Sequence, residues 1–226
     1  MRGRNTLIAK NKNRLDLILN IAIIVCTLVA TGVYFVSGPD ALGSQKTACF
    51  RYFTTDSNVL VALTSIVMLV YNIRKNRAPE TEVPRWALIF RYVGVTSVTI
   101  TLLTVVFFLA PMAAMRGGLA GYFRFFEGNT FALHFSTPVI AIVAFCLLEK
   151  DRKLTVKDSL WALLPTVIYS IVYLVLVVFA KVWTDWYGFT FGGQTVMIPV
   201  SMIAMYLVTW GVANVLRVIG PKTNKA

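Results

Sequence analysis

One histidine and one short polar stretch hold the residue types that could carry chemistry. His134 is the only histidine, and residues 51–58 read RYFTTDSN in a chain that is otherwise strongly apolar. A threonine hydroxyl beside an imidazole forms a nucleophile and a base, because neutral imidazole can take the hydroxyl proton as the oxygen attacks an acyl carbon. The residue types alone leave Thr54, Thr55 and Ser57 open as the hydroxyl.

The same stretch offers groups that could support such a pair. Asn58 lies four residues after Thr54 and shares its helix face, so its amide could point into the same cavity. Asp56 is costly to place against lipid. It either pairs with Arg51, five residues earlier, or acts as an orienting carboxylate.

Two other segments combine polar and aromatic residues. Residues 124–129 read RFFEGN and end at Asn129, and residues 183–189 read WTDWYGF around Asp185. Trp and Tyr in such places most simply form an interfacial belt. The functional alternative is a lid over the cavity, in which Asp185 or Glu127 orients the imidazole.

Both members of the candidate pair also have a purely structural interpretation. A membrane histidine can serve helix packing through a hydrogen bond to a neighbouring backbone or hydroxyl group. Threonine in a membrane helix usually bonds back to a carbonyl one turn earlier. An ionisable group within a membrane is nevertheless functional by default, and this favours a site at His134.

The composition places these residues in a membrane protein. The chain has 226 residues, of which 57% are hydrophobic and 14% charged, and its mean hydropathy is +0.70. These values exclude a soluble enzyme of this size. The three cysteines lack CxxC or Cys/His spacing, and no cofactor motif is present, so we expect no metal and no cofactor.

Long apolar stretches predict a single domain of six transmembrane helices, an all-α fold. The first stretch is too long for the apolar region of a signal peptide, and no small-residue cleavage site follows it. We therefore expect it to remain as the first helix. The predicted spans are 15–36, 48–73, 85–110, 129–149, 159–181 and 195–219, with Pro111 and residues 116–118 in the third connection.

The basic residues predict the orientation of the helices. Most of the 22 Lys and Arg residues lie in the amino-terminal tail, the second and fourth connections and the carboxyl-terminal end. By the positive-inside rule, both termini are then cytoplasmic in a multi-pass protein of the cell membrane. The net charge of +12 therefore reflects topology, and we expect no nucleic-acid partner. Arg91, inside the third span, is expected to snorkel to the inner headgroups, with an inner gate or salt bridge as the alternative.

The predicted spans bring Thr54 and His134 to the same depth. Each lies five or six residues from the outer end of its helix, roughly 7–9 Å in at about 1.5 Å per residue. Pro138 lies four residues after His134, so the His134 carbonyl is expected to lose its helical partner and the helix to kink. A kinked helix at the only histidine favours a pocket.

These residues resemble those of a known family. The six spans, the RYFT stretch that opens the second helix (residues 51–54) and the Leu133-His134 stretch that opens the fourth look like the androgen-induced family of integral membrane hydrolases. Animal members of this family cleave fatty acid esters of hydroxy fatty acids. The FTTxSN motif and the WYxF loop make the chain look like a bacterial member.

The resemblance implies specific roles. The family's catalytic threonine and histidine match Thr54 and His134, so Thr54 would attack an ester carbonyl and His134 would act as base and then acid. The substrate would be a lipid-like ester that enters from the bilayer. Asp56 departs from the family pattern and puts the substrate in doubt.

A rival hypothesis keeps the site but changes the function. A small membrane transporter or a lipid-binding protein could use His134, Asp56 and Arg51 as a proton-linked or anion-binding site. A non-catalytic sensor is a third alternative. Membrane lipids are expected partners in every case.

Overall fold

The computed structural model describes residues 2–37, 46–149, 154–194 and 196–219, and within these residues the chain is helical and contains no β-strand. Short 3₁₀ or π-helical turns join several of the helices. The α-helices are α1 (Arg2–Val36), α2 (Phe53–Arg77), α3 (Arg85–Thr104), α4 (Ala110–Phe123), α5 (Gly128–Phe131), α6 (Thr137–Val143), α7 (Asp158–Trp161), α8 (Leu164–Leu174) and α9 (Met197–Ile219).

Six helical segments are long and apolar enough to cross a membrane, which confirms the predicted fold class. Large apolar side chains point outward along them, as lipid contact requires: Leu28, Phe107 and Phe179 are 66%, 73% and 78% exposed. The spans are Asn11–Val36, Phe53–Arg77, Arg85–Phe126, Gly128–Leu148, Asp158–Phe179 and Met197–Ile219.

The third span differs most from its prediction. It was expected to end at residue 110, but helical structure continues beyond that point, through α4 (Ala110–Phe123) and a 3₁₀ turn at Arg124–Phe126. Pro111 does not break it, because this proline lies in the first turn of α4, directly after a π-helical turn at Val105–Leu109. The chain bends further along, at Gly118, where φ is +61°. The second helix also starts later than predicted, at Phe53, after a 3₁₀ turn at Lys46–Arg51.

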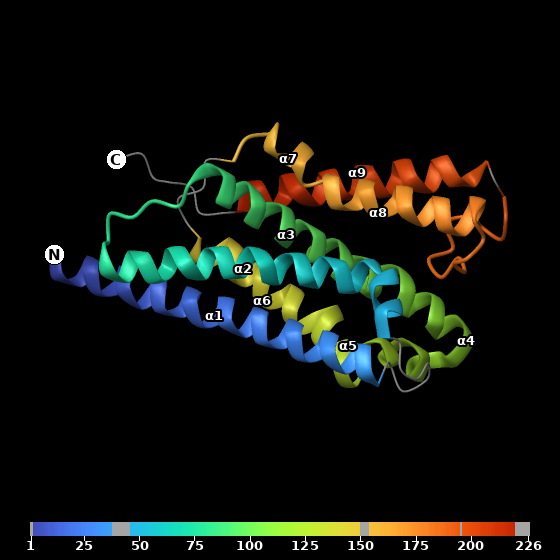
Figure 1. Ribbon diagram of the computed structural model, residues 1–226, viewed down its shortest axis with the longest axis horizontal. Helices are drawn as coiled ribbons and strands as arrows, with labels where there is room; N and C mark the ends of the chain where they lie inside the picture. The colour runs from blue at the N-terminus through green and yellow to red at the C-terminus, as the bar shows by residue number, and fades with distance from the viewer. Residues whose placement is uncertain (1, 38–45, 150–153, 195, 220–226) are drawn as a thin grey trace.

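The helices alternate in direction, so α1 begins and α9 ends at the same end of the bundle (Figure 1). We call this the near end, and we call the end where α1 finishes and α2 begins the far end. Helix α3 runs through the middle, packing against α2, α6 and α9, with α1 beside α2 on one side and α8 beside α9 on the other.

Helices α2 and α3 approach closely because of a glycine. A Cβ atom added at Gly94 would lie 2.8 Å from the Thr64 Cγ2 atom and 3.2 Å from the Val61 Cα atom. Only a residue without a side chain fits at this contact. The close approach brings Arg91, one turn earlier on α3, within reach of the polar side chains of α2.

Candidate functional site

The His134 ring is held in one orientation by a backbone carbonyl. His134 lies in the π-helical turn Ala132–Ser136, and its Nδ1 atom is 2.7 Å from the carbonyl oxygen of Phe125. A carbonyl oxygen can only accept, so Nδ1 carries the proton and donates it. In the neutral ring, Nε2 then keeps its lone pair and is available as a base.

Asn58 ties the start of α2 to the turn that holds His134. Its Nδ2 atom donates to the Thr54 carbonyl at 2.7 Å and to the Leu133 carbonyl at 2.9 Å. Asn58 is fully buried, so these bonds are shielded from solvent and lipid. The same amide group thus bonds to the carbonyl of Thr54 itself and to the carbonyl of Leu133, the residue before His134.

Pro138 explains why the Leu133 carbonyl needs this donor. The N–H of Thr137 bonds to the Ala132 carbonyl, five residues earlier. In this register the partner of the Leu133 carbonyl would be the nitrogen of Pro138, which has no hydrogen. The expectation that the His134 carbonyl is the one affected was therefore one residue off, because the π-helical turn shifts the register.

The three candidate hydroxyls have different surroundings. Thr54 is half-buried and lines a small cavity of about 40 Å³. Thr55 is fully buried, and its hydroxyl meets no partner among the described residues. The Ser57 hydroxyl is already bonded to the Thr54 carbonyl at 3.1 Å and to the Thr101 hydroxyl at 2.8 Å. Thr54 is therefore the hydroxyl best placed to meet a ligand, although within the described chain no hydrogen bond joins it directly to His134.

Asp56 does not form the ion pair with Arg51 that one interpretation expected; in the described part of the chain no salt bridge joins them. The Arg51 residue is exposed, and its carbonyl accepts a hydrogen bond from the Tyr169 hydroxyl at 2.7 Å. Asp56 instead lines a second, larger cavity of about 710 Å³. The grouping of His134, Asp56 and Arg51 in one polar site thus receives no support from their contacts.

Asp185 organises its own loop. Its carboxylate accepts hydrogen bonds from the Tyr173 hydroxyl, the Phe189 N–H, and the N–H and hydroxyl of Thr190, at 2.6–2.9 Å. Burial raises the pKa of Asp185, but these donors, Thr190 foremost, outweigh it and leave the pKa below its ordinary value. The expectation that Asp185 orients the imidazole is wrong, since the Phe125 carbonyl has that place.

The aromatic residues of this loop face inward, which favours the lid over the interfacial belt. Tyr187 is only 8% exposed, and burial raises its pKa to about 12. Its hydroxyl oxygen accepts a hydrogen bond from the Phe53 N–H at 3.2 Å. Tyr187 and Phe189 line the small cavity beside Thr54, and Trp183 lines the larger one. The loop therefore forms walls of both cavities.

Asn129 lies on α5, the short helix that leads into the turn of His134. Its Nδ2 atom is buried and finds no acceptor among the described residues. A buried amide with unused hydrogens is available to a ligand oxygen.

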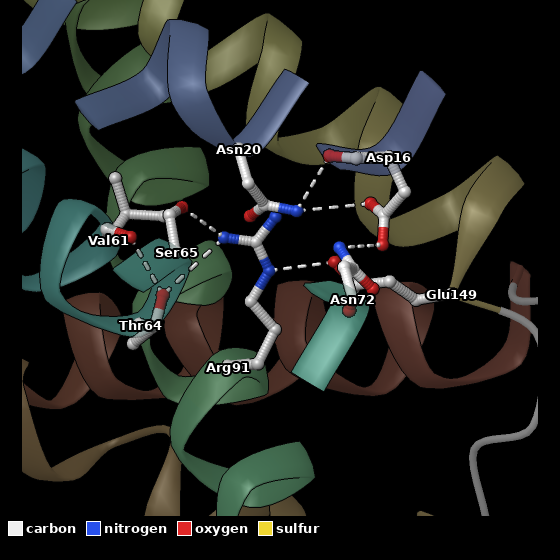
Figure 2. A network of polar contacts seen from close by, with 8 residues as sticks. All are labelled: Asp16, Asn20, Val61, Thr64, Ser65, Asn72, Arg91 and Glu149. Carbon is white, nitrogen blue, oxygen red and sulfur yellow. Dashed lines mark hydrogen bonds and ion pairs between the residues drawn. The ribbon is translucent and has the colours of Figure 1, made fainter. Parts of the chain in front are cut away.

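Figure 2 shows a second polar centre, in which side chains of α1, α2 and α3 lie together with Glu149. Arg91 is fully buried, its Nε atom lies 2.8 Å from Glu149 Oε1, and its Nη1 atom donates to the Ser65 hydroxyl at 2.7 Å. The expectation that Arg91 snorkels is wrong, and the salt-bridge alternative is confirmed. Glu149 supplies the compensating charge inside the bundle, so the side chain has no need to reach the headgroups.

The remainder of this centre joins α1 to α2. Asp16 accepts hydrogen bonds from Asn20, one turn later on α1, and from Asn72 at 2.9 Å. These residues were overlooked because each was counted within an apolar span. Asp16 and Asn20 are spaced i, i+4, and this spacing was a readable signal of a shared buried face.

Comparisons of the chain with family models, with curated proteins and with solved structures find no match. The family resemblance of the sequence thus stays a prediction. Function has to be argued from the arrangement at the far end.

Proposed function

We propose that the chain is a membrane-embedded hydrolase of lipid-like esters, with Thr54 as nucleophile and His134 as base. The observation that carries the proposal is the Asn58 amide, which bonds the Thr54 carbonyl and the carbonyl next to His134. The sequence resemblance to the androgen-induced hydrolases supports the same pair.

The chemistry begins with the proton held at Nδ1 by Phe125. Nε2 of His134 takes the proton from the Thr54 hydroxyl as Oγ1 forms a bond to the ester carbonyl carbon. The Asn129 amide is the proposed donor to the developing oxyanion. No hydrogen bond joins the Thr54 hydroxyl to His134 among the described residues. This agrees with the proposed step, because catalytic hydrogen bonds often form fully only in the substrate complex.

The remaining steps return the protein to its starting state. The tetrahedral intermediate breaks the bond to the alcohol oxygen, which takes the proton from Nε2, and an acyl-Thr54 ester remains. Water then attacks this ester and gives a proton to Nε2. Oγ1 leaves the carbonyl carbon and regains that proton, so that the acid is released and the hydroxyl restored.

We further propose that both termini face the cytoplasm of a cell, with the far end outside. The supporting observation is the gathering of Lys and Arg in the segments at the near end, such as Arg74, Lys75 and Arg77 at the end of α2. A cysteine placed at Ala78 should react with a membrane-impermeant maleimide only after lysis. Reaction in intact cells would reverse the orientation.

The hydrolase is tested with purified protein, a long-chain p-nitrophenyl ester and a fluorophosphonate probe. We expect ester turnover and a probe adduct located on Thr54 by mass spectrometry. Thr54→Ala and His134→Ala should each abolish turnover, whereas Thr54→Ser keeps a hydroxyl and should retain it in part. The matched control is Thr130→Ala, which removes a hydroxyl from the same end of the bundle and should behave as wild type.

Three results would count against the proposal. Unchanged turnover in His134→Ala would show that His134 is not the base, and a probe adduct on another residue would show that Thr54 is not the nucleophile. Uptake of a solute coupled to pH in liposomes, lost in His134→Ala and kept in Thr54→Ala, would replace the hydrolase by a transporter.

A further inference from the structure

The larger cavity is a groove lined by four helices. Helix α3 contributes Ile89, Phe90 and Val93, and further lining residues come from α2, α7 and α8. Along α8 alone the lining extends from Leu164 to Val172, about 12 Å at 1.5 Å per residue. Its volume of about 710 Å³ is within the usual range for small-molecule sites.

Asp56 is the single ionisable carboxyl group among the residues that line this groove. Two buried carboxylates elsewhere in the bundle, Asp16 and Glu149, accept hydrogen bonds from Asn72 and Arg91. In the part of the chain that the structure describes, neither a hydrogen bond nor a salt bridge occupies the Asp56 carboxylate. A carboxylate in an apolar membrane groove is costly unless a positive charge compensates it.

Aromatic rings lie on the same surface. Phe53 is one turn before Asp56 on α2, and Phe50 and Trp183 line the groove from segments at the far end. Trp86, at the start of α3, and Trp161, at the end of α7, line it toward the near end. Aromatic faces attract ammonium groups, and their apolar surface suits a hydrocarbon chain.

We propose that this groove binds a single-chain amphiphile with a protonated amine head, drawn from the surrounding bilayer. The ammonium pairs with Asp56 among the far-end rings, and the hydrocarbon chain lies on α3 toward Trp86. An anionic head is repelled by the carboxylate, and a neutral head leaves the charge uncompensated. The site is separate from the proposed catalytic pair, because neither Thr54 nor His134 lines it.

The test compares three probes that share a twelve-carbon chain: dodecylamine, dodecanol and dodecanoate. Binding to the full-length protein in nanodiscs is followed by tryptophan fluorescence, since Trp86, Trp161 and Trp183 line the groove. We expect dodecylamine to bind most tightly. Asp56→Asn should raise the Kd of dodecylamine about tenfold or more and change the Kd of dodecanol less than about twofold. Glu127→Gln, which removes an exposed carboxylate at the far end, should leave the Kd values of all three probes unchanged.

Two further variants keep the outcome interpretable. Leu60→Trp narrows the groove one turn after Asp56 on α2, and should weaken the binding of dodecylamine and of dodecanol to a similar extent. Thr54→Ala should bind dodecylamine as wild type does, so failure of the hydrolase proposal leaves this one intact. Equal affinity for the amine and the alcohol, tighter binding of dodecanoate, or an unchanged Kd in Asp56→Asn would overturn the proposal.

Discussion

The Asn58 amide compensates for a backbone donor that Pro138 lacks, and this claim can be tested by restoring the donor. Asn58→Leu keeps the approximate size of the side chain but removes both hydrogen bonds. The Thr54 carbonyl still receives the Ser57 hydroxyl at 3.1 Å, so most of the cost falls on the Leu133 carbonyl.

The expected cost follows from these contacts. A buried acceptor left without a partner costs about 1–3 kcal/mol, whereas interhelical side-chain hydrogen bonds in membrane proteins average about 0.6 kcal/mol. We expect Asn58→Leu to lower the free energy of unfolding by about 1–2 kcal/mol. Pro138→Ala supplies an N–H to the Leu133 carbonyl, so in the Asn58→Leu background it should regain about 1 kcal/mol. In the wild-type background the same change gains less, because the carbonyl is already satisfied.

The assay is a double-mutant cycle. The wild type, both single variants and the double variant are unfolded reversibly in mixed micelles, and their free energies of unfolding are compared. Asn214→Leu is the matched control, since its amide also bonds to a carbonyl one turn earlier but compensates for no proline. If the two changes are simply additive, Asn58 does not act on the gap left by Pro138, and the link between α2 and the histidine turn loses its explanation.

Two further outcomes follow from the remaining polar contacts. Arg91→Leu removes the guanidinium that neutralises Glu149 and should cost about 3 kcal/mol or more in the same unfolding assay, with part recovered by adding Glu149→Gln; a cost near zero would show that the ion pair is dispensable. Asp185 has a pKa below its ordinary 3.8, so its stabilisation is present above that pH and lost as the pH falls through the lower folded-state value. Asp185→Asn should therefore reduce the dependence of thermal stability on pH in the acid range, and an unchanged acid profile would contradict the assignment.

The helical architecture could be predicted because lipid imposes a simple requirement on the sequence. Each span needs about 20 apolar residues, and these runs are visible in the chain. The ends of the spans were harder to predict, because a proline or a glycine has different effects in different turns. Pro111 was expected to follow the end of the third span, yet a π-helical turn accommodates this proline. In the register of that turn, the Val106 carbonyl lies opposite the Pro111 nitrogen, which has no hydrogen. The Tyr122 hydroxyl donates to this carbonyl instead.

The site could be predicted in its residues but not in its contacts. Depth and polarity located Thr54, Asn58 and His134 at one end of the bundle. The register shift at His134 depends on backbone hydrogen bonding that residue types do not reveal. Asp185 was one of two carboxylates offered as orienting the imidazole in the lid alternative, but its carboxylate accepts hydrogen bonds from Tyr173 and from its own loop.

The two ends of the bundle use their polar groups differently, and this difference bears on function. Toward the near end, Asp16 accepts a hydrogen bond from Asn72, which joins α1 to α2, and Glu149 pairs with Arg91, which joins the end of the fourth span to α3. At the far end, Asp56 and the Asn129 amide have no such partner among the described residues. Unused polar groups are costly in a membrane, and packing gains nothing from them. The partner of Asp56 is therefore expected to be a molecule that enters the larger cavity, and ligands are best sought at the far end.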